Sequence, residues 1–528
     1  MNNSLKKRLL SVAMAAVMVF SLLPATAWAA MAENLPAASG QTRTEQKRGG
    51  SDTYTVTRDV KSVAAAQTGA VKKVVCLDLT TGEDQVSLDA SGGYRWVAGA
   101  NYLYLYKVHI EAEGSNALVL PAGATVLVVG KCSITGGGAN ECAVWSKGDV
   151  TVTLGQDAAL TVNGLGWRAE GNLTVAQAYD AYTGGELTVN YNGTSSDNGT
   201  SGAAIYMGGN TLYVEQGARV TANGSGIGNV KAKDSCGVKG AVHVDGGAEL
   251  TADGGSAGST GISYGIFGSV TVKNGTVTAN GGSGLQSYGV SGDSVSVSDG
   301  GVLNANGGTA VQDLNSGIKP ISGGIYLGNN AVIENAAVNA SGGVAPCGDS
   351  FASVGLQMTS RSEVTVNSGG VLNATGGQLT NGSSANEADG FSAGINMMGA
   401  GAADLFVNGT GRVTAIGNPE RLDGGPVRSY GVNYTDMGEL TIELGGVASF
   451  KAAGGTAASR AAFTPDTVSI KGSEAYRDFD NVTDGYKFFI KGSPEDRVSR
   501  VCLSSSSLKQ SIDYWNRLLS MNIFESTD

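Results

Sequence analysis

The sequence is poor in charge, in proline and in the residues that most often carry catalysis. Charged residues make up 15% of the 528 residues, whereas soluble domains average about a quarter. There are nine prolines and two histidines. Scarce proline suits strands that must donate hydrogen bonds on both sides. The formal net charge of −11 argues against nucleic acid as a partner, because phosphate backbones repel an acidic surface.

Cysteine is sparse and shows no metal or disulfide spacing. No Cys-x-x-Cys pair occurs among the six cysteines, which are Cys76, Cys132, Cys142, Cys236, Cys347 and Cys502. This spread argues against a zinc site and against a compact disulfide framework. Cys132 and Cys142 are close enough to be bridged across a bend, which an oxidising compartment would permit. The alternative is that they are small buried apolar residues.

Long apolar runs are also lacking, apart from one at the N-terminus. The basic residues Lys6 to Arg8 precede the apolar stretch Leu9 to Leu23, and Ala27-Trp-Ala29 has the small-x-small pattern of a cleavage site. We expect residues 1–29 to be a signal peptide and the protein to be secreted, extracellular and in part associated with the cell surface. A retained membrane anchor is the alternative, but the run is short for a bilayer span, and we expect no span in the mature chain. Residues 30–73 are polar and aperiodic, which predicts a flexible segment.

Glycine and a short repeat are what the sequence has in abundance. Its 81 glycines are about twice the usual share. The phrase Ser263-Tyr-Gly-Ile returns 24 residues later as Ser287-Tyr-Gly-Val, and Val277-Thr-Ala-Asn-Gly-Gly282 returns as Val302-Leu-Asn-Ala-Asn-Gly-Gly308. Each copy predicts two short strands with inward apolar residues at alternate positions. Such a unit is too small to bury a core alone, so the copies must stack.

The repeat predicts a β-solenoid. An apolar-x-apolar strand followed by a Gly-containing bend can be followed from Val150 to Ile442, and each strand must pair with the same strand of the next copy. We therefore expect an all-β fold, a single-stranded parallel β-helix of about 13 coils, right-handed, spanning residues 74–470, with coils spaced about 4.8 Å apart. Residues 471–528 are expected to form a C-terminal cap, with a helix over Ser507 to Phe524. A β-propeller is the structural alternative, but its blades need about 40 residues.

The Gly-rich bends predict their own local chemistry. Asn280-Gly-Gly, Asn306-Gly-Gly and Thr375-Gly-Gly recur after the second strand of a copy. We expect glycine to supply positive φ there. Asparagine side chains at equivalent positions of successive copies are expected to stack into ladders.

The sequence resembles a known group of proteins in its core and turn residues. The phrases that carry the resemblance are Tyr94-Arg-Trp96, Leu103-Tyr-Leu105, Leu120-Pro-Ala-Gly-Ala-Thr-Val126, Ile134-Thr-Gly-Gly, Gly148-Asp-Val-Thr-Val152 and Leu160-Thr-Val162. They resemble the Gly-rich parallel β-helix proteins exported by Gram-positive anaerobes, and the likeness extends over about Val74 to Ile470. It implies a pectin-lyase-like fold, and some of these proteins are described as carbohydrate-binding domain proteins.

Parallel β-helices often host lyases and hydrolases, so the fold is compatible with an enzyme. Glycoside hydrolysis needs two carboxylates about 5 to 10 Å apart, yet no Asp-Asp pair occurs anywhere in the chain. The two histidines, His109 and His243, lack a catalytic context. The residues therefore favour a protein without enzymatic activity, with a polysaccharide lyase or glycoside hydrolase as the alternative.

One polar group and two aromatic groups are the candidate sites. His109, Glu111 and Glu113 alternate along one strand face. Together they could bind a metal ion, and Ca²⁺ is the candidate cofactor. A solvated strand face is the simpler interpretation. Two sets of tyrosines, Tyr102, Tyr104 and Tyr106, and Tyr264, Tyr288 and Tyr430, would each form a strip if they face outward. Aromatic faces suit sugar rings, although such strips also stabilise coils.

These patterns lead to two functional hypotheses beside the enzyme. The first is an adhesin-like protein that binds a polysaccharide or a cell-surface glycan through the tyrosines. The second is a passive spacer about 60 to 70 Å long, the length of about 13 stacked coils.

Overall fold

The computed structural model is all-β. It describes residues 43–45, 54–56, 72–138, 141–179, 184–193, 202–224, 234–257, 261–312, 319–346, 351–380, 390–398, 402–418, 428–435, 439–444, 448–454, 459–463, 468–471 and 500–504. Within these ranges there is no α-helix, and the one short helical turn is the 3-10 turn η1 (Ala98–Ala100). No helix in the described part of the chain is long and apolar enough to cross a membrane. The expected signal peptide (1–29) and C-terminal helix (507–524) lie outside the described residues.

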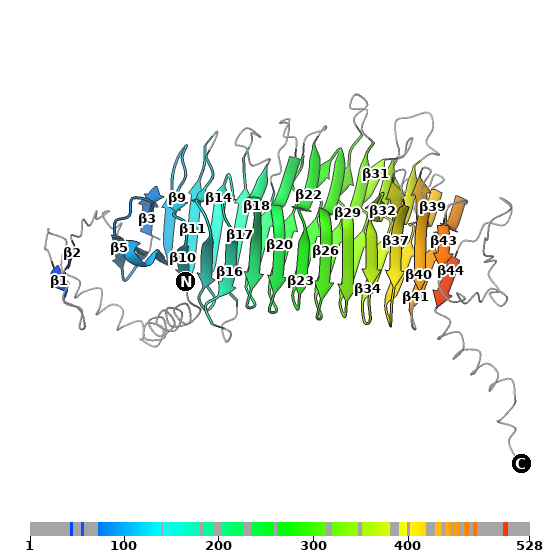
Figure 1. Ribbon diagram of the computed structural model, residues 1–528. Helices are drawn as coiled ribbons and strands as arrows, with labels where there is room; N and C mark the ends of the chain where they lie inside the picture. Colours follow the sequence, from blue (N-terminus) through cyan, green and yellow to red (C-terminus); the bar gives the residue numbers. More distant parts are fainter. Residues whose placement is uncertain are drawn as a thin grey trace, which may run out of the picture.

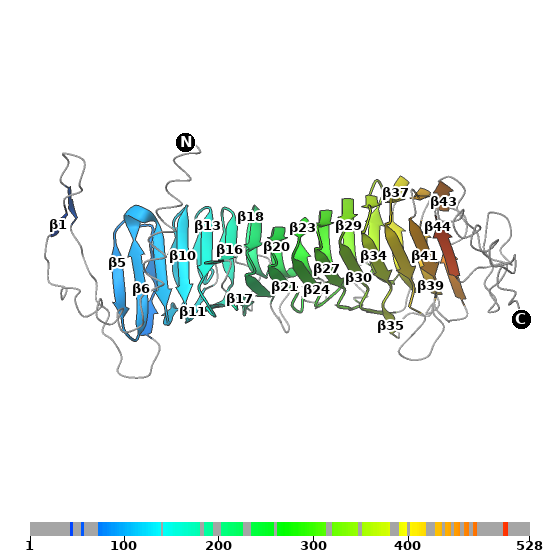
Figure 2. The same ribbon diagram turned by 90° about the horizontal axis from the view of Figure 1, so that it is seen from below.

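The strands stack along one long axis in three parallel sheets (Figures 1 and 2). The sheet of 24 strands contains β4 (Leu77–Asp78), β5 (Gln85–Asp89), β6 (Gly92–Val97), β7 (Tyr102–Tyr106), β9 (Leu118–Leu120), β10 (Ala124–Val129), β12 (Val144–Ser146), β13 (Val150–Leu154), β15 (Trp167–Ala169), β16 (Leu173–Gln177), β18 (Ala203–Glu215), β20 (Asp234–Asp245), β22 (Ile262–Phe267), β23 (Val270–Lys273), β26 (Gln286–Ser298), β29 (Ile321–Glu334), β32 (Ala352–Thr359), β33 (Glu363–Val366), β36 (Phe391–Met398), β37 (Ala402–Val407), β39 (Arg428–Thr435), β40 (Glu439–Leu444), β42 (Ser459–Phe463) and β43 (Val468–Lys471).

Two smaller parallel sheets supply the remaining strands of the stack. The sheet of 14 strands contains β3 (Lys72–Val75), β8 (Val108–Glu111), β11 (Lys131–Gly136), β14 (Ala159–Gly164), β17 (Glu186–Tyr191), β19 (Arg219–Asn223), β21 (Glu249–Asp253), β24 (Thr276–Asn280), β27 (Val302–Asn306), β30 (Ala337–Ser341), β34 (Val371–Thr375), β38 (Arg412–Ile416), β41 (Ser449–Ala453) and β44 (Arg500–Ser504). The sheet of four contains β25 (Ser283–Gly284), β28 (Thr309–Ala310), β31 (Val344–Pro346) and β35 (Gln378–Thr380). Separately, β1 (Arg43–Glu45) pairs with β2 (Tyr54–Val56) inside the segment 30–73.

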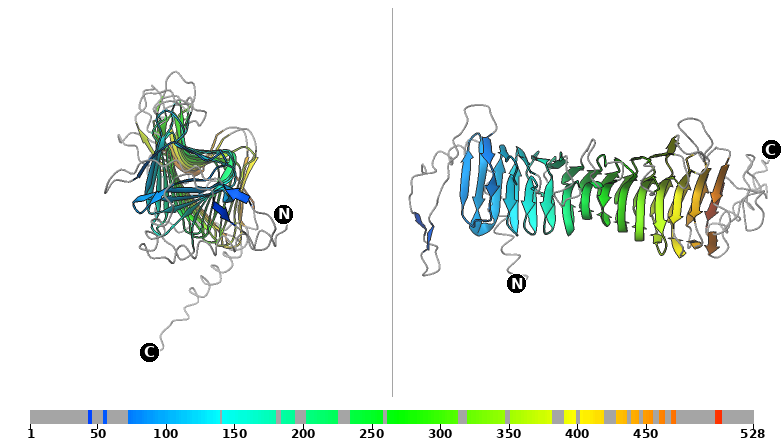
Figure 3. Two further views of the ribbon diagram at one scale, coloured as in Figure 1. Left: turned by 90° about the vertical axis from the view of Figure 1, so that its left-hand side faces the viewer. Right: turned by 90° about the horizontal axis from the view of Figure 1, so that it is seen from above.

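Equivalent strands of successive copies pair in parallel, as the repeat predicts. Val277 of β24 lies beside Leu303 of β27, and Val270 of β23 lies beside Val295 of β26. Among the described residues, strands pair antiparallel in the stack only at its ends, between β5, β6 and β7 and between β41 and β44. Two isolated antiparallel bridges, Gly138–Glu141 and Leu165–Tyr191, lie within it. Seen along the axis, the sheets surround a common interior (Figure 3). This is the arrangement expected of a β-solenoid.

Alternation along each strand decides what enters that interior. In β7, Leu103 and Leu105 are fully buried while the tyrosines between them are half-buried. Val108 and Ile110 of β8 are buried on the opposite parity. Lys107, between the two strands, has φ +44° and marks the bend at which the parity changes. One continuous cluster of buried apolar side chains runs from Val74 to Ala452. Burial of these stacked residues is the main stabilising contribution in such a repeat.

Asparagine ladders run along the outside of the 14-stranded sheet, as the bends predict. The side-chain Nδ2 of Asn190 donates to Asn163 at 2.9 Å, and that of Asn223 donates to Asn190 at 2.7 Å. The same column continues with Asn280 donating to Asp253 and Asn306 donating to Asn280. A second column joins Asn304, Asn339 and Asn373.

A buried serine column connects the strands to the Gly-Gly bends. Ser287 is fully buried. Its hydroxyl donates to the carbonyl of Gly282, at the end of the preceding copy, at 2.7 Å and accepts from the N–H of Gly308, in its own copy, at 2.9 Å. The fully buried serines of this column are Ser235, Ser263, Ser287, Ser322, Ser353, Ser392 and Ser429. The pattern of donating to one bend and accepting from the next recurs at Ser263, Ser322, Ser353 and Ser392.

Glycine at these bends serves close packing and not positive φ, so that part of the prediction is wrong. Neither Gly281 nor Gly282 has a positive φ. A Cβ built on Gly282 would lie 2.1 Å from the carbonyl oxygen of Gly255, and one on Gly281 would lie 2.4 Å from the Oγ of Ser287. The backbone of one bend therefore rests directly on the bend before it, which leaves no room for a side chain.

Candidate functional site

The tyrosines of β7 form a half-buried strip on the outside of the 24-stranded sheet. The rings of Tyr104 and Tyr106 stack with their centroids 6.4 Å apart and an interplanar angle of 22°. The ammonium of Lys107 lies 5.1 Å from the centroid of the Tyr106 ring. Burial raises the pKa of Tyr104 to about 12 and raises that of Tyr102 further. As expected, Tyr102, Tyr104 and Tyr106 share the face opposite the buried leucines, with their rings only partly open to solvent.

Tyr264 and Tyr288 stack on each other but do not face solvent, so the exposed strip predicted for them is wrong. Their rings lie 6.2 Å apart with an interplanar angle of 17°. Only 8% of Tyr264 and 3% of Tyr288 are exposed, in an apolar cluster separate from the main core. The ring centroids of Phe267 and Tyr264 are 4.8 Å apart, and those of Tyr326 and Tyr288 are 5.6 Å apart. The rings of Phe267 and Tyr326 therefore cover the tyrosine pair. Burial raises the pKa of both tyrosines well above the ordinary value.

Tyr430 occupies the same column but is separated from that pair. Three coils without an aromatic ring lie between, at Gly323, Val354 and Ala393. A Cβ on Gly323 would lie 2.7 Å from the ring of Tyr288, so this ring rests over the glycine. The half-buried Tyr430 packs at 6.2 Å against Phe391. The six predicted tyrosines therefore lie in three separate places, the strip of β7, the Tyr264–Tyr288 pair and Tyr430, and form no common surface.

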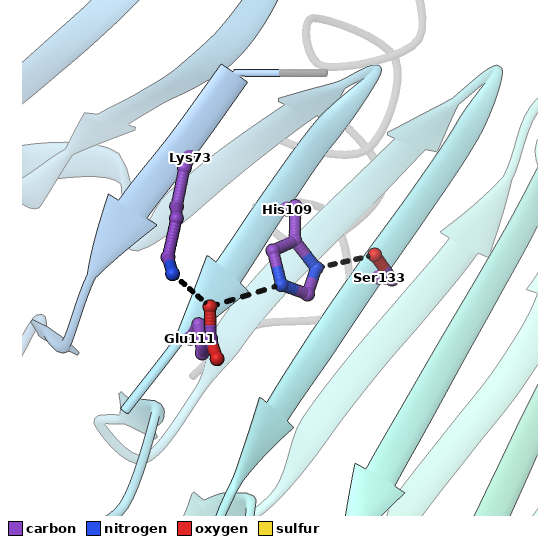
Figure 4. Close-up of polar contacts among 4 residues, drawn as sticks. All are labelled: Lys73, His109, Glu111 and Ser133. Carbon is purple, nitrogen blue, oxygen red and sulfur yellow. Dashed lines mark hydrogen bonds and ion pairs between the residues drawn. The ribbon is translucent and has the colours of Figure 1, made fainter. Parts of the chain in front are cut away.

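His109, Glu111 and Glu113 do not gather around a common point, so the predicted metal trio is not formed. β8 ends at Glu111, and the strand alternation that would align Glu113 stops there. His109 Nδ1 contacts the Oγ of Ser133 at 2.7 Å, and its Nε2 is 3.5 Å from Glu111, whose carboxylate also pairs with Lys73 (Figure 4). Among the described residues, no group of three or more histidine, cysteine or acidic side chains could hold a metal ion.

This polar chain resembles the order of a nucleophile, a base and an acid but lacks the geometry for that chemistry. The 3.5 Å between His109 and Glu111 is longer than the hydrogen bond that would orient the imidazole. Lys73 competes for the same carboxylate, and its hydrogen bond is the main cause that lowers the pKa of Glu111. The four residues instead link three neighbouring strands, β3, β8 and β11, across the sheet surface.

A column of aromatic and basic residues, not predicted from the sequence, crosses successive strands of the 24-stranded sheet. We name it the aromatic–basic column. Register places its members side by side in the order Trp145, Arg168, Tyr206, Lys239, Phe267, Ser291 and Tyr326. An aromatic ring occurs in every second coil. Two of the three positions between the rings hold a cation.

The column faces outward because its neighbours along each strand face inward. Ile205 and Met207, which flank Tyr206, are fully buried. Ile266, which precedes Phe267, is also fully buried, while Phe267 itself is 41% exposed. Of the other members, Ser291 is buried and the remaining five are half-buried.

Cations and rings of the column are in contact. The ammonium of Lys239 lies 6.0 Å from the centroid of Tyr206 and 5.5 Å from that of Phe267. The guanidinium of Arg168 lies 5.8 Å from Trp145, whose ring also has Lys147 at 4.8 Å. Such contacts are worth about 0.5–1 kcal/mol at exposed sites and hold both partners in place.

One sequence signal could have revealed this column. Each member directly follows an inward apolar residue, as in Ile205-Tyr206, Val238-Lys239, Ile266-Phe267 and Ile325-Tyr326. Alignment of the copies on that apolar position places the rings and cations in one row.

Four of the six cysteines, Cys76, Cys132, Cys142 and Cys236, are free. Cys132 and Cys142 are both buried, and neither forms a disulfide, which agrees with their interpretation as small buried residues. Burial raises the pKa of Cys142 to about 11.

Comparisons with known proteins do not assign the chain to a family. No protein-family model matches it, and neither a curated protein nor a solved structure matches it at a significant level. Any functional conclusion therefore depends on the surface described above.

Proposed function

We propose that this protein is an exported, adhesin-like β-helix that binds an extracellular polysaccharide or a cell-surface glycan without cleaving it. The proposal includes a right-handed, single-stranded parallel β-helix of about 13 coils. Export is part of the proposal because of the basic and apolar pattern of residues 1–29.

The aromatic–basic column is the observation that carries the proposal. Sugar rings present apolar C–H faces that pack on aromatic side chains, and their hydroxyls hydrogen-bond to adjacent polar groups. Phe267 and Tyr326 are outward members two coils apart, with Lys239 in contact with Phe267. A row of rings along a rigid stack suits an extended polymer better than a single small molecule.

The tyrosine strip of β7 is a second, smaller platform for the same ligand class. Tyr102, Tyr104 and Tyr106 are half-buried and so remain partly open to solvent. Tyr264 and Tyr288 have no direct part in binding, because Phe267 and Tyr326 cover them.

Binding to immobilised polysaccharides and to a glycan array tests the proposal. We expect the purified protein to be retained by at least one glycan and the double variant Phe267→Ala with Tyr326→Ala to lose that retention. Tyr213→Ala is the matched control, since Tyr213 is a half-buried outward tyrosine on β18 that lies outside the column and packs at 5.5 Å against His243. Its retention should be unchanged.

Three results would argue against the proposal. A folded protein that binds no glycan would favour the passive spacer. Retention that survives loss of both rings would move the site elsewhere. Release of reducing ends or unsaturated products from pectin, alginate or mucin glycans would favour the lyase or hydrolase.

A further inference from the structure

The aromatic–basic column has a period of two coils. Rings at Trp145, Tyr206, Phe267 and Tyr326 alternate with Arg168, Lys239 and Ser291. Parallel strands of successive coils lie about 4.8 Å apart, so like members of the column recur about every 9.6 Å. That distance is close to the length of one extended disaccharide in a linear polysaccharide.

The charge of the column is opposite to that of the molecule. The chain carries a net charge of −11, yet Arg168 and Lys239 belong to the column and Lys147 lies over its first ring. A half-exposed acid, Glu170, lies 3.7 Å from the guanidinium of Arg168. Positive groups gathered on an acidic protein indicate a negatively charged ligand at this place.

We infer that the aromatic–basic column binds, along the long axis of the stack, a linear glycan in which an acidic sugar alternates with an uncharged one. This inference rests on the proposed glycan-binding function. The uncharged sugar packs on a ring, and the carboxylate of the next sugar meets a cation in the following coil. Arg168 and Lys239 supply these cations, whereas the third intermediate position is held by the buried Ser291, which supplies none.

The alternation of rings and cations in the column favours this ligand over a polymer that has an acid on every sugar. The face of an aromatic ring carries the negative part of its quadrupole and therefore repels a carboxylate held above it. A uniformly acidic chain would place carboxylates over Tyr206 and Phe267 as well as beside the cations. A neutral chain would leave the cations without a partner from the ligand.

Calorimetric titration with three oligosaccharides of equal length tests the inference. Hyaluronan alternates an acidic and a neutral sugar, polygalacturonate is acidic at every sugar, and chitin oligomers are neutral. We expect hyaluronan to bind at least about tenfold more tightly than either of the others, because it alone matches both rings and cations. Higher salt should weaken this binding.

Charge variants locate the interaction. Arg168→Gln combined with Lys239→Gln should lower hyaluronan affinity at least about tenfold and remove most of its salt dependence. Lys273→Gln is the control, because Lys273 pairs with Asp299 and lies outside the column. Glu170→Gln should raise the affinity, since it removes the competitor of the ligand carboxylate. Unchanged unfolding midpoints show that the variants fold.

The outcomes separate this inference from the proposed function. Equal or tighter binding of polygalacturonate overturns it. Equal binding of chitin, with no effect of the Arg168 and Lys239 changes, also overturns it but leaves glycan binding through the rings intact. If none of the three oligomers and no glycan on the array binds the folded protein, both conclusions fail.

Discussion

At the residue scale, single polar atoms hold one coil on the next. The hydroxyl of Ser287 donates to a carbonyl of the preceding copy and accepts from an N–H of its own copy. Both backbone groups belong to bends in which Gly282 and Gly308 lie too close to the neighbouring bend for a side chain. The carbonyl of Gly282 also accepts from the N–H of Thr309, whereas the serine hydroxyl is the partner of the Gly308 N–H.

Ser287→Ala should therefore destabilise the protein by about 1–3 kcal/mol, the cost of leaving the N–H of Gly308 without its hydrogen-bond partner. Urea unfolding monitored by circular dichroism measures the change. Ser296→Ala, on the outward face of the same strand, is the control and should change stability by less than about 0.5 kcal/mol. An equal loss in both variants would contradict a specific role for the serine column.

The Lys73–Glu111 pair gives a residue-scale prediction of pH dependence. The hydrogen bond from Lys73 lowers the pKa of Glu111 in the folded state, so the pair stabilises the protein above the ordinary carboxyl pKa. That contribution is lost as the pH falls through the lowered value. Lys73→Ala should move the pKa of Glu111 upward toward its usual range, which an NMR titration of the carboxyl carbon would detect. An unchanged pKa would show that His109 alone sets it.

At the element scale, ladders keep neighbouring strands in register. Asn280 donates to Asp253 and accepts from Asn306, so its amide uses both a donor and an acceptor along the column. A slip of one residue between β21, β24 and β27 would break these bonds and also turn the apolar side chains outward. The ladder and the core therefore specify the same pairing.

Asn280→Asp tests this coupling. The new carboxylate cannot donate to Asp253 and places like charges side by side, which should cost about 1–2 kcal/mol at neutral pH. Proximity to Asp253 raises the pKa of the new carboxyl in the folded state, so the deficit should shrink as the pH falls toward about 4. Unfolding midpoints at the two pH values relative to the unmodified protein would show it. A deficit independent of pH would point to steric disturbance.

At the scale of the whole molecule, stability comes from contacts between neighbours in the stack. The apolar cluster is continuous from Val74 to Ala452, and its rows pass through every copy without a break. In such an array the copies are nearly interchangeable, provided that the columns stay aligned.

Deletion of residues 263–286, one whole copy, should leave a folded protein. It joins Ile262 to Ser287 and aligns every column of the preceding copy with its counterpart one coil further on. Circular dichroism and a cooperative unfolding transition would verify the fold. Deletion of 12 residues, half a copy, is the control and should abolish the transition. Failure of the full-copy deletion alone would show that the copies are not equivalent.

Much of this architecture could be predicted because local patterns and the repeat agree. Alternation at Leu103 and Leu105 determines which side chains face inward, and the 24-residue period requires parallel pairing with the next copy. The asparagine ladders follow from the same alignment. Such features depend on period and parity, which are read directly along the chain.

What covers a residue could not be predicted in this way. Tyr264 and Tyr288 occupy equivalent positions, as expected, but Phe267 and Tyr326 lie over them and remove them from solvent. Likewise, His109 and Glu111 share a face, yet contacts with Ser133 and Lys73 on other strands occupy them. The exposure of a side chain and its contacts depend on the neighbouring strands on both sides, so neither can be predicted from the pattern of one strand.

The sequence by itself determined the repeat, its parallel stacking and the inward set of apolar residues, because alternation and period act within and between adjacent copies. Only the tertiary structure decided which aromatic rings reach the surface and that cations alternate with them. Trp145, Tyr206 and Phe267 are separated by 61 positions at each step along the sequence (206 − 145 and 267 − 206), and coiling alone places them in one row.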